Sequence, residues 1–290
     1  MATTAKVGST RRWEMTRSYE PYSDDPDYVQ ANRAFIEELP LAQTRSLLDL
    51  ACGIGTLTRL ALEVNPGLSI IGLDLSHEGL RIAKRRLDAM GGIDVSLMTA
   101  TADALPLASE SVDAVVMGHS IHMLPDERRL LSEIRRVSKP GSLFAFNTSF
   151  YAGTFVPGTE GVYHDWTMRA IGYVRQKDRE MKERGEPGVR RTKGSAPAAF
   201  SRPWLSPGEW MERLDEAGFD VSSEKVRTVP LTQRSFEAIG AYAGFAQVLL
   251  SGYPVKLACE ALQAAAAPTF EAAGIERVPR NWLEVVAARR

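Results

Sequence analysis

The sequence contains few of the residues from which disulfide frameworks and metal centres are built. Its 290 residues include only two cysteines and four histidines. Cys52 and Cys259 stand far apart, one in a glycine-containing turn and the other in an expected helix. We therefore expect neither a disulfide framework nor a zinc site, and this composition fits a protein of the reducing cytoplasm.

Charge of one sign and long apolar runs are also missing. The 35 basic and 36 acidic side chains leave a formal net charge of -1, so no general field favours nucleic acid or an anionic membrane. No apolar run is long enough to cross a bilayer. Residues 1–17 are polar, lack the apolar stretch of a signal peptide and are expected to fray. We expect a small-molecule partner, with no nucleic acid and no membrane insertion.

The most informative stretch that is present covers residues 46–62 and reads SLLDLACGIGTLTRLAL. A strand-like apolar run passes through a glycine turn into a helical pattern, which brings bare backbone N–H groups and a helix N-terminus close to a ligand. Gly53 and Gly55 are expected to let that ligand approach where a Cβ atom would collide with it. The dinucleotide fingerprint needs a third glycine, and its position holds Thr58.

Two acidic residues follow later strands and suggest what the ligand is. Residues 68–73 form a second apolar strand, which delivers Asp74 about twenty residues after the glycines. A carboxylate at this place can accept hydrogen bonds from both ribose hydroxyls of a nucleoside. A third strand near residues 95–99 precedes Asp103, which could accept from an exocyclic adenine amine. Together these positions predict a nucleoside-containing ligand, although each aspartate could instead cap its own loop.

In these motifs the chain resembles the class I S-adenosylmethionine-dependent methyltransferases, and most of all the ubiquinone/menaquinone-biosynthesis-like (type 11) group that acts on small molecules. The first motif of that family is an acidic residue followed by alternating glycines, and Asp49 opens the matching run DLACGIG. Ala51 replaces the first glycine, a departure expected to be mild because alanine adds one methyl group. Lys139, Pro140 and Gly141 match a further landmark, a turn expected to lead into a strand over residues 142–148.

The resemblance, which covers residues 47–149, also implies which residues hold S-adenosylmethionine. By resemblance to the family, the first-motif loop contacts the methionine portion of the cofactor and the end of the second strand contacts the ribose. The loop after the third strand contacts the adenine. The N-terminal segment of this family often covers the cofactor, although its tyrosines could simply pack. The implied contacts are Asp49, Ala51, Gly53 and Gly55; Asp74 and Leu75; Asp103 and Ala104; the Met117 or Gly118 carbonyl for the methionine amine; and Tyr22, with Tyr19 and Tyr28.

The pattern predicts an α/β, Rossmann-like fold. We expect a seven-stranded, mostly parallel sheet with an antiparallel last strand, helices on both faces and helical lid insertions. Ser76 and the pair Ser206 and Glu209 are expected helix caps, and Pro254 and Pro268 should divide an alanine-rich region into two or three helices. The predicted segments are an N-terminal cap (1–45), a cofactor-binding core (46–150), an acceptor lid (151–205), a core helix with strand six (206–234), a helical insertion (235–279) and strand seven (280–290).

Three histidines are candidates for a general base. His119 and His122 follow the fourth strand at the sheet edge where ligands of such folds bind, and both side chains titrate near neutrality. His122 matches a histidine often seen at this place in the family. His164 lies in the expected lid. Each could instead line a pocket or stabilise the fold, but we expect at least one to face the acceptor.

The leading prediction is methyl transfer to the oxygen or carbon of a small, largely apolar acceptor, such as a quinone, phenol, isoprenoid or other secondary metabolite. Aromatic residues between 150 and 166 favour this class, and the charged run 175–193 could face an anionic tail or simply be a solvated helix. One alternative is a protein that keeps the cofactor pocket but catalyses a non-methylating reaction such as a cyclisation. A nicotinamide-dependent oxidoreductase is disfavoured by the missing third glycine. The sequence leaves a homodimer open.

Overall fold

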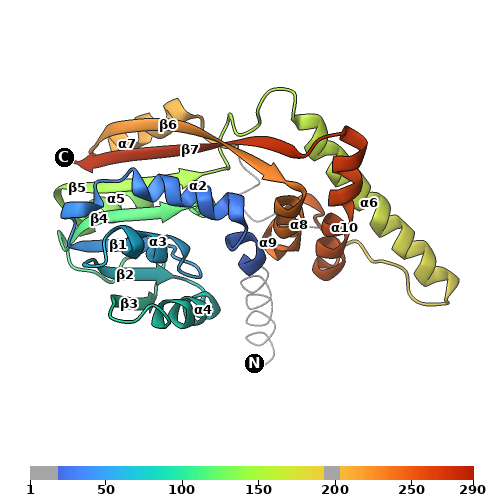
Figure 1. The fold of residues 1–290 in the computed structure, drawn as a ribbon, viewed down its shortest axis with the longest axis horizontal. Coiled ribbons are helices and arrows are strands. Elements are labelled where there is room, and N and C mark those ends of the chain that lie inside the picture. The colour runs from blue at the N-terminus through green and yellow to red at the C-terminus, as the bar shows by residue number, and fades with distance from the viewer. Residues whose placement is uncertain (1–18, 193–202) are drawn as a thin grey trace. The chain divides into compact units, whose positions relative to one another are not determined.

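The computed structural model describes residues 19–192 and 203–290 and contains a seven-stranded sheet in the order β3-β2-β1-β4-β5-β7-β6 (Figure 1). The segment 1–17, expected to fray, and residues 193–202 of the expected lid lie outside the described residues. Neighbouring strands from β3 to β5 pair in parallel, and β7 pairs antiparallel with β5. The predicted fold class is therefore confirmed. The strands are β1 (Ser46–Leu50), β2 (Ser69–Asp74), β3 (Asp94–Thr99), β4 (Val112–Gly118), β5 (Ser138–Thr148), β6 (Phe219–Thr232) and β7 (Arg277–Arg289).

Two helices begin at the caps that the sequence indicates. The Ser76 hydroxyl accepts from Gly79 N at the start of α4, and Ser206 forms a reciprocal capping box with Glu209 at the start of α7. These side chains satisfy backbone N–H groups that have no partner within the helix. The helices are α2 (Pro26–Glu37), α3 (Thr56–Val64), α4 (His77–Asp88), α5 (Glu127–Val137), α6 (Glu160–Glu183), α7 (Pro207–Glu216), α8 (Gln233–Ala241), α9 (Ala243–Leu249) and α10 (Val255–Ala273), with short 3-10 turns at Leu41–Gln43 and Ile121–Met123.

Side chains of the central strands alternate between two apolar cores, because successive residues of a strand point to opposite faces of the sheet. Leu48 of β1 packs in one core with Ile134 of α5 and Trp210 of α7. Leu47, its neighbour in the strand, packs in the second core with residues of α2, α3 and α4. The sheet is thus covered by helices on both faces, which leaves its strand ends as the places where polar loops are exposed.

The chain divides into two compact units that do not follow the linear order of the sequence. The core unit comprises residues 29–154, 203–227 and 281–290. The helical unit comprises the described residues of 1–28, 155–202 and 228–280, including α6, α8, α9 and α10. Within the helical unit, the Trp166 indole of α6 donates a hydrogen bond to the Leu262 carbonyl of α10 at 2.7 Å.

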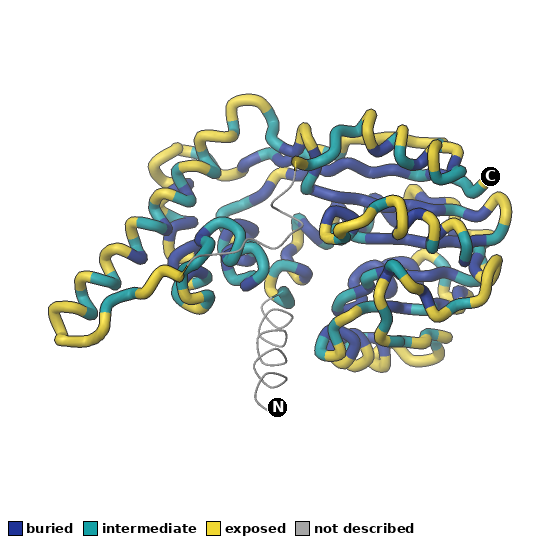
Figure 2. Tube along the Cα trace, turned by 180° about the vertical axis from the view of Figure 1, so that it is seen from behind, coloured by how far each residue is buried: buried dark blue, intermediate teal, exposed yellow. Residues whose placement is uncertain are grey.

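The charged run of α6 carries no buried residue. The buried residues of this helix are Trp166, Ala170 and Val174, all of which precede the run, and Figure 2 shows that the far end of α6 is mainly exposed. Lys182 pairs with Asp178 at 2.7 Å within the run. Exposed pairs of this kind contribute little to stability, about 0–1 kcal/mol each.

The Lys-Pro-Gly sequence is not the turn that we expected before the strand at residues 142–148. β5 already begins at Ser138, which pairs with Val112, and pairing resumes between Leu143 and Ala114 after a register shift. The intervening residues bulge out of the ladder, and Gly141 adopts a φ of 74°. A bulge accommodates Pro140, which cannot donate a ladder hydrogen bond, and glycine supplies the left-handed conformation.

Pro268 was also expected to end a helix, and this prediction is wrong. The region contains three helices, and Pro268 lies inside α10, whereas Pro254 is its N-cap residue. An internal proline costs a helix about 3 kcal/mol. Here the helix buries Leu262 and Phe270, one on each side of the proline, and burial of large apolar side chains contributes about 1.5–3 kcal/mol each. Packing of α10 therefore offsets the cost of the proline.

Within the part of the chain that the structure describes, no helix combines the length and apolar character needed to cross a membrane.

Candidate active site

The glycine loop between β1 and α3 is built from left-handed backbone. Ala51, Gly53 and Gly55 have φ values of 60°, 55° and 83°. The loop is fastened to the next strand because Cys52 N donates to the Leu73 carbonyl at 3.0 Å. Gly55 is the N-cap residue of α3, so the backbone N–H groups of the first turn of this helix follow directly after the loop.

The two glycines serve different purposes, which corrects our expectation that both make room for a ligand. A Cβ atom on Gly53 would meet no atom within 4 Å, whereas one on Gly55 would lie 3.2 Å from Ala83 Cβ in α4. Only Gly53 therefore borders open space. The replacement of the first motif glycine by Ala51 is also less mild than we expected. A left-handed conformation costs a non-glycine residue about 1–2 kcal/mol.

Asp74 ends β2 and holds the glycine loop in place. Its Oδ2 atom accepts from Gly53 N at 2.9 Å, and its Oδ1 atom accepts from Ser76 N at 2.7 Å. The loop-capping role is thus present in the structure. It does not exclude ligand binding, because each oxygen of an ionised carboxylate can accept two hydrogen bonds. Leu75, the next residue, exposes 44% of its surface.

Gly79, which the sequence reasoning missed, brings α4 against the same loop. A Cβ atom at this position would lie 3.0 Å from the Gly53 carbonyl oxygen. Gly79 occupies the first turn of α4, directly after the Ser76 cap. A glycine in the first turn of an otherwise regular helix is the signal that could have identified this contact, because glycine weakens a helix interior and needs a compensating reason.

Asp49 lies beneath the loop and is 1% exposed. Its Oδ2 atom accepts from the Thr58 hydroxyl at 2.5 Å. Burial raises the pKa of the Asp49 carboxyl to about 6, partly opposed by the bond from Thr58, while the Asp74 charge adds to the increase. A buried carboxylate of this kind gains most from a nearby cation, because a positive charge favours its ionised form.

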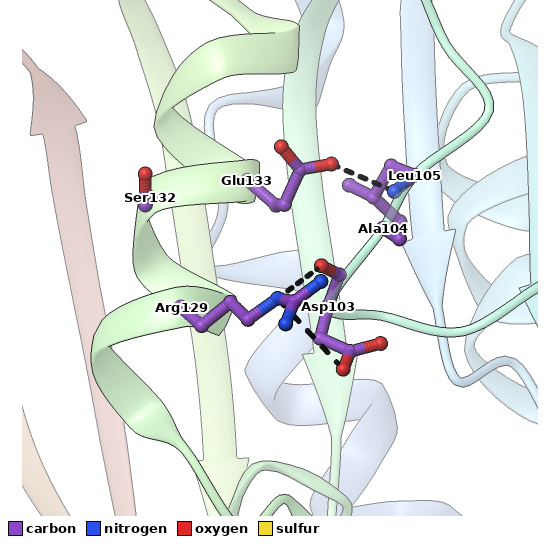
Figure 3. A pocket seen from close by; sticks show the side chains of 6 residues that line it. All are labelled: Asp103, Ala104, Leu105, Arg129, Ser132 and Glu133. Carbon is purple, nitrogen blue, oxygen red and sulfur yellow. Dashed lines mark hydrogen bonds and ion pairs between the residues drawn. The ribbon is translucent and has the colours of Figure 1, made fainter.

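Asp103 and Ala104 lie in the loop after β3, on the core unit. Asp103 is half-buried and Ala104 is exposed. Both line a hollow of about 350 Å³ beside α5, and Figure 3 shows them opposite Arg129 and Glu133 of that helix. In a parallel sheet, this loop emerges at the same edge as the glycine loop and Asp74.

The end of β4 carries His119 in a left-handed conformation, with φ 46°. Its backbone N–H donates to the Asn147 backbone carbonyl at 3.0 Å and lies 3.1 Å from the Asn147 side-chain oxygen. Its ring packs edge-on against Trp282, with centroids 4.0 Å apart. Met117, two residues earlier, is completely buried. The His119 ring is therefore held at the carboxyl edge of the sheet.

His122 is buried, with 6% of its surface exposed. Its Nδ1 atom lies 3.1 Å from the Thr148 hydroxyl, and its ring stacks on Phe150 with centroids 4.2 Å apart. These contacts fix the orientation of the His122 ring.

Asn147 is a further site residue that the sequence reasoning missed. It is fully buried at the end of β5, and its side-chain amide donates to Asn32 Oδ1 of α2 at 2.9 Å. The same amide presents its oxygen to His119 N. Because buried polar groups must be hydrogen-bonded to be tolerated, two fully buried asparagines in contact indicate that the position of His119 is specified. The available signal was an asparagine directly after the apolar run of residues 143–146.

Tyr22 and His164 belong to the helical unit. The Tyr22 ring lies 5.8 Å from that of Tyr19 and 4.6 Å from that of Tyr28. Burial raises the pKa of Tyr22 far above its usual value, so its hydroxyl stays protonated. His164 is an exposed residue of α6. The structure thus brings the loop residues, Asp74 and the two histidines after β4 to one sheet edge, and it places Tyr22 and His164 in the other unit.

Comparison with known proteins agrees with this geometry. Residues 48–146 match a family described as a methyltransferase domain. A demethylmenaquinone methyltransferase from Thermotoga maritima is 31% identical over 192 residues, which are 61% of this chain and 71% of the relative. One from Lactococcus lactis is 40% identical over 97 residues, 33% of this chain and 38% of the relative. The chain spans about half the length of the curated relatives it matches first.

A solved structure shows the same fold. It is a putative sarcosine dimethylglycine methyltransferase from Galdieria sulphuraria, with a TM-score of 0.54 and 13% identity, covering 90% of this chain and 86% of that one. The sheet, its glycine loop and the acidic end of β2 define a Rossmann-like nucleoside-binding protein. The chain belongs to the class I S-adenosylmethionine-dependent methyltransferases, within the ubiquinone/menaquinone-biosynthesis-like group.

The residues present fit S-adenosylmethionine. Gly53 leaves open space beside the loop backbone. Asp49 and Asp74 supply negative charge for a ligand that carries a sulfonium and an amine. The Asp74 carboxylate is a group that accepts hydrogen bonds from sugar hydroxyls.

Proposed function

We propose that this protein transfers the methyl group of S-adenosylmethionine to an oxygen or carbon of a small, largely apolar acceptor of the quinone, phenol or isoprenoid type. The observation that carries this proposal is the glycine loop fastened by Asp74 at the carboxyl edge of the sheet. The names of the demethylmenaquinone methyltransferases support a quinone-like acceptor.

In this proposal the cofactor lies along the loops of the core unit. Asp49, Ala51, Gly53 and Gly55 surround the methionine portion, with the Met117 or Gly118 carbonyl at its amine. Asp74 holds the ribose and Leu75 lies beside the adenine, whose edge is read by Asp103 and Ala104. By the family resemblance, Tyr22 is a further proposed contact of the cofactor.

S-adenosylmethionine supplies a methyl group that is already activated on a sulfonium. An electron pair of the acceptor forms the new bond to that carbon as the carbon–sulfur bond breaks, and the acceptor loses a proton. The chain must therefore align the reactants and receive the proton. Alignment of this kind can lower a barrier by about 7–11 kcal/mol, and a positioned base adds about 100- to 10,000-fold.

His119, His122 and His164 remain the proposed bases. We expect His119→Ala to lower the single-turnover methylation rate by about 100-fold, because general-base catalysis contributes at least that much. Asn147→Leu should lower it less, since it removes only the side-chain acceptor near His119 N and leaves the bond to the Asn147 backbone carbonyl and the imidazole in place. His77→Ala is the control, because His77 is exposed on α4 and bonds Thr99. Near-normal rates in alanine variants of all three candidate histidines would show that positioning alone drives the reaction.

The activity is tested with S-adenosylmethionine labelled in its methyl group. The full chain is incubated with a short-chain demethylmenaquinone, a simple phenol, an isoprenoid acid and an amine, and products are analysed by mass spectrometry. We expect the label in the quinone or phenol product, at carbon or oxygen. Binding of the cofactor without label in any product would contradict methyl transfer and favour a non-methylating reaction.

The raised pKa of Asp49 predicts that cofactor affinity depends on pH. A cationic ligand favours the ionised carboxylate, so the attraction is present above pH 6 and is lost as the pH falls through about 6. We expect the Kd for S-adenosylmethionine, measured by calorimetry, to increase about tenfold from pH 7 to pH 5. Asp49→Asn should flatten this part of the profile. An equally steep profile in that variant would show that another group titrates.

A further inference from the structure

The loop that carries Asp103 and Ala104 has little regular structure of its own, yet its backbone is tightly bonded. Arg129, Glu133 and Arg136 of α5 contact it from positions spaced by four and three residues. Residues at this spacing lie on one face of a helix. The helix therefore presents a row of charged side chains to the loop, as Figure 3 shows for Arg129 and Glu133.

Glu133 and Arg136 bond both backbone groups of Leu105. Glu133 Oε2 accepts from Leu105 N at 2.7 Å, and Arg136 Nη2 donates to the Leu105 carbonyl at 2.8 Å. Arg136 Nη1 also donates to the Leu107 carbonyl at 2.7 Å. The two side chains are joined by bonds of 2.7 and 2.8 Å. The Arg136 guanidinium holds the pKa of Glu133 below its usual value, so the pair is ionised at neutral pH.

Arg129 acts on the preceding part of the loop. Its Nε atom donates to the Asp103 backbone carbonyl at 2.9 Å and lies 3.9 Å from the Asp103 carboxylate. The Arg129 side chain is 60% exposed. It therefore restricts the backbone of Asp103 while the carboxylate keeps capacity for another donor.

We propose that Glu133, Arg136 and Arg129 are positioning residues for adenine recognition, a role that rests on the proposed contact between Asp103 and the adenine amine. They fix the loop so that the Asp103 carboxylate faces the exocyclic amine at hydrogen-bond distance. A site built to accept from an amine rejects a base with a carbonyl in its place, because two acceptors then face each other. The α5 residues thus govern discrimination between adenine and hypoxanthine.

A role confined to fold stability would leave a different signature. Partly exposed ion pairs contribute little to global stability, so loss of Arg136 should change the unfolding midpoint slightly. Arg136 donates to the Leu105 and Leu107 carbonyls, which belong to the same loop. Loss of these bonds should therefore change the conformation of that loop. Base discrimination, unlike thermal stability, reports where the Asp103 carboxylate lies.

The experiment compares binding of S-adenosylhomocysteine and S-inosylhomocysteine to the full chain by calorimetry. We expect the wild-type protein to prefer the adenine ligand by about 100-fold, the scale of about two hydrogen-bond energies. Arg136→Ala and Glu133→Gln should reduce this ratio by about tenfold, and Arg129→Ala by less. Arg128→Ala is the matched control, because Arg128 lies on the same helix and pairs with Glu216 at the surface. Its ratio should match that of the wild type.

The outcomes separate the two proposals. A wild-type protein that discriminates, with folded Arg136→Ala and Glu133→Gln variants whose ratios stay within about twofold of it, would overturn the positioning role and leave the proposed function intact. The conservative Glu133→Gln variant keeps the shape of the side chain, so it remains informative if Arg136→Ala fails to fold. A wild-type protein that binds both ligands equally would overturn the contact of Asp103 with adenine and the positioning role with it, whereas one that binds neither would overturn the proposed function.

Discussion

Replacing Asp74 with alanine is expected to weaken S-adenosylhomocysteine binding by at least about 100-fold. In the proposed function this carboxylate accepts from both ribose hydroxyls, and hydrogen bonds to charged groups contribute about 1.5–3 kcal/mol each. The same substitution frees Gly53 N and Ser76 N, so the loop loses its attachment as well. Calorimetry with the spent cofactor gives the Kd directly, without any acceptor.

Two further variants show whether this loss is specific. Asp74→Asn keeps one side-chain oxygen and should bind more tightly than the alanine variant, though less tightly than the wild type. Asp88→Ala removes an exposed carboxylate that pairs with Lys84 on α4, and it should bind normally. An Asp74→Ala protein that is folded and binds the cofactor within about threefold of the wild type would remove the central support of the proposed function.

Gly55→Val is expected to lower the free energy of unfolding by about 2–5 kcal/mol, because the left-handed conformation costs about 1–2 kcal/mol and overpacking about 1–3 kcal/mol. Its Cβ atom would press on Ala83 and displace α4. Gly53→Ala is the contrasting variant, since its Cβ atom would enter open space. We expect it to cost about 1 kcal/mol of stability but to weaken cofactor binding more than Gly55→Val does.

Denaturant titration measures the two stabilities, and calorimetry of the folded proteins measures the two affinities. If the two glycines have different roles, Gly55→Val should lose more stability and Gly53→Ala should lose more affinity. Equal loss of stability in both variants would show that the close approach of α4 to Gly55 does not require a glycine there.

The sheet and the ends of its strands could be predicted from the sequence because the signals are local. An apolar run followed by Asp74 places that carboxylate at the edge of a parallel sheet without knowledge of any distant contact. The Ser76 cap is likewise determined by residues within one helical turn. For the same reason, the terminal antiparallel strand was predicted from its own apolar pattern.

Contacts between distant segments could not be predicted in this way. The role of Gly55 depends on Ala83, and that of Asn147 depends on Asn32, so neither is visible in the flanking sequence. The same limit explains Pro268, which is a helix breaker by local rules but lies inside α10. Its tolerance depends on tertiary packing, which overrides propensity.

The position of β7 has a consequence for how the protein is made. This strand is the last element of the sequence, yet it lies between β5 and β6. During synthesis both neighbours therefore leave the ribosome before the strand that joins them, and they wait with unpaired edges. Such edges are prone to pair with other chains, so a substitution that weakens β7 would expose the edges of β5 and β6 together.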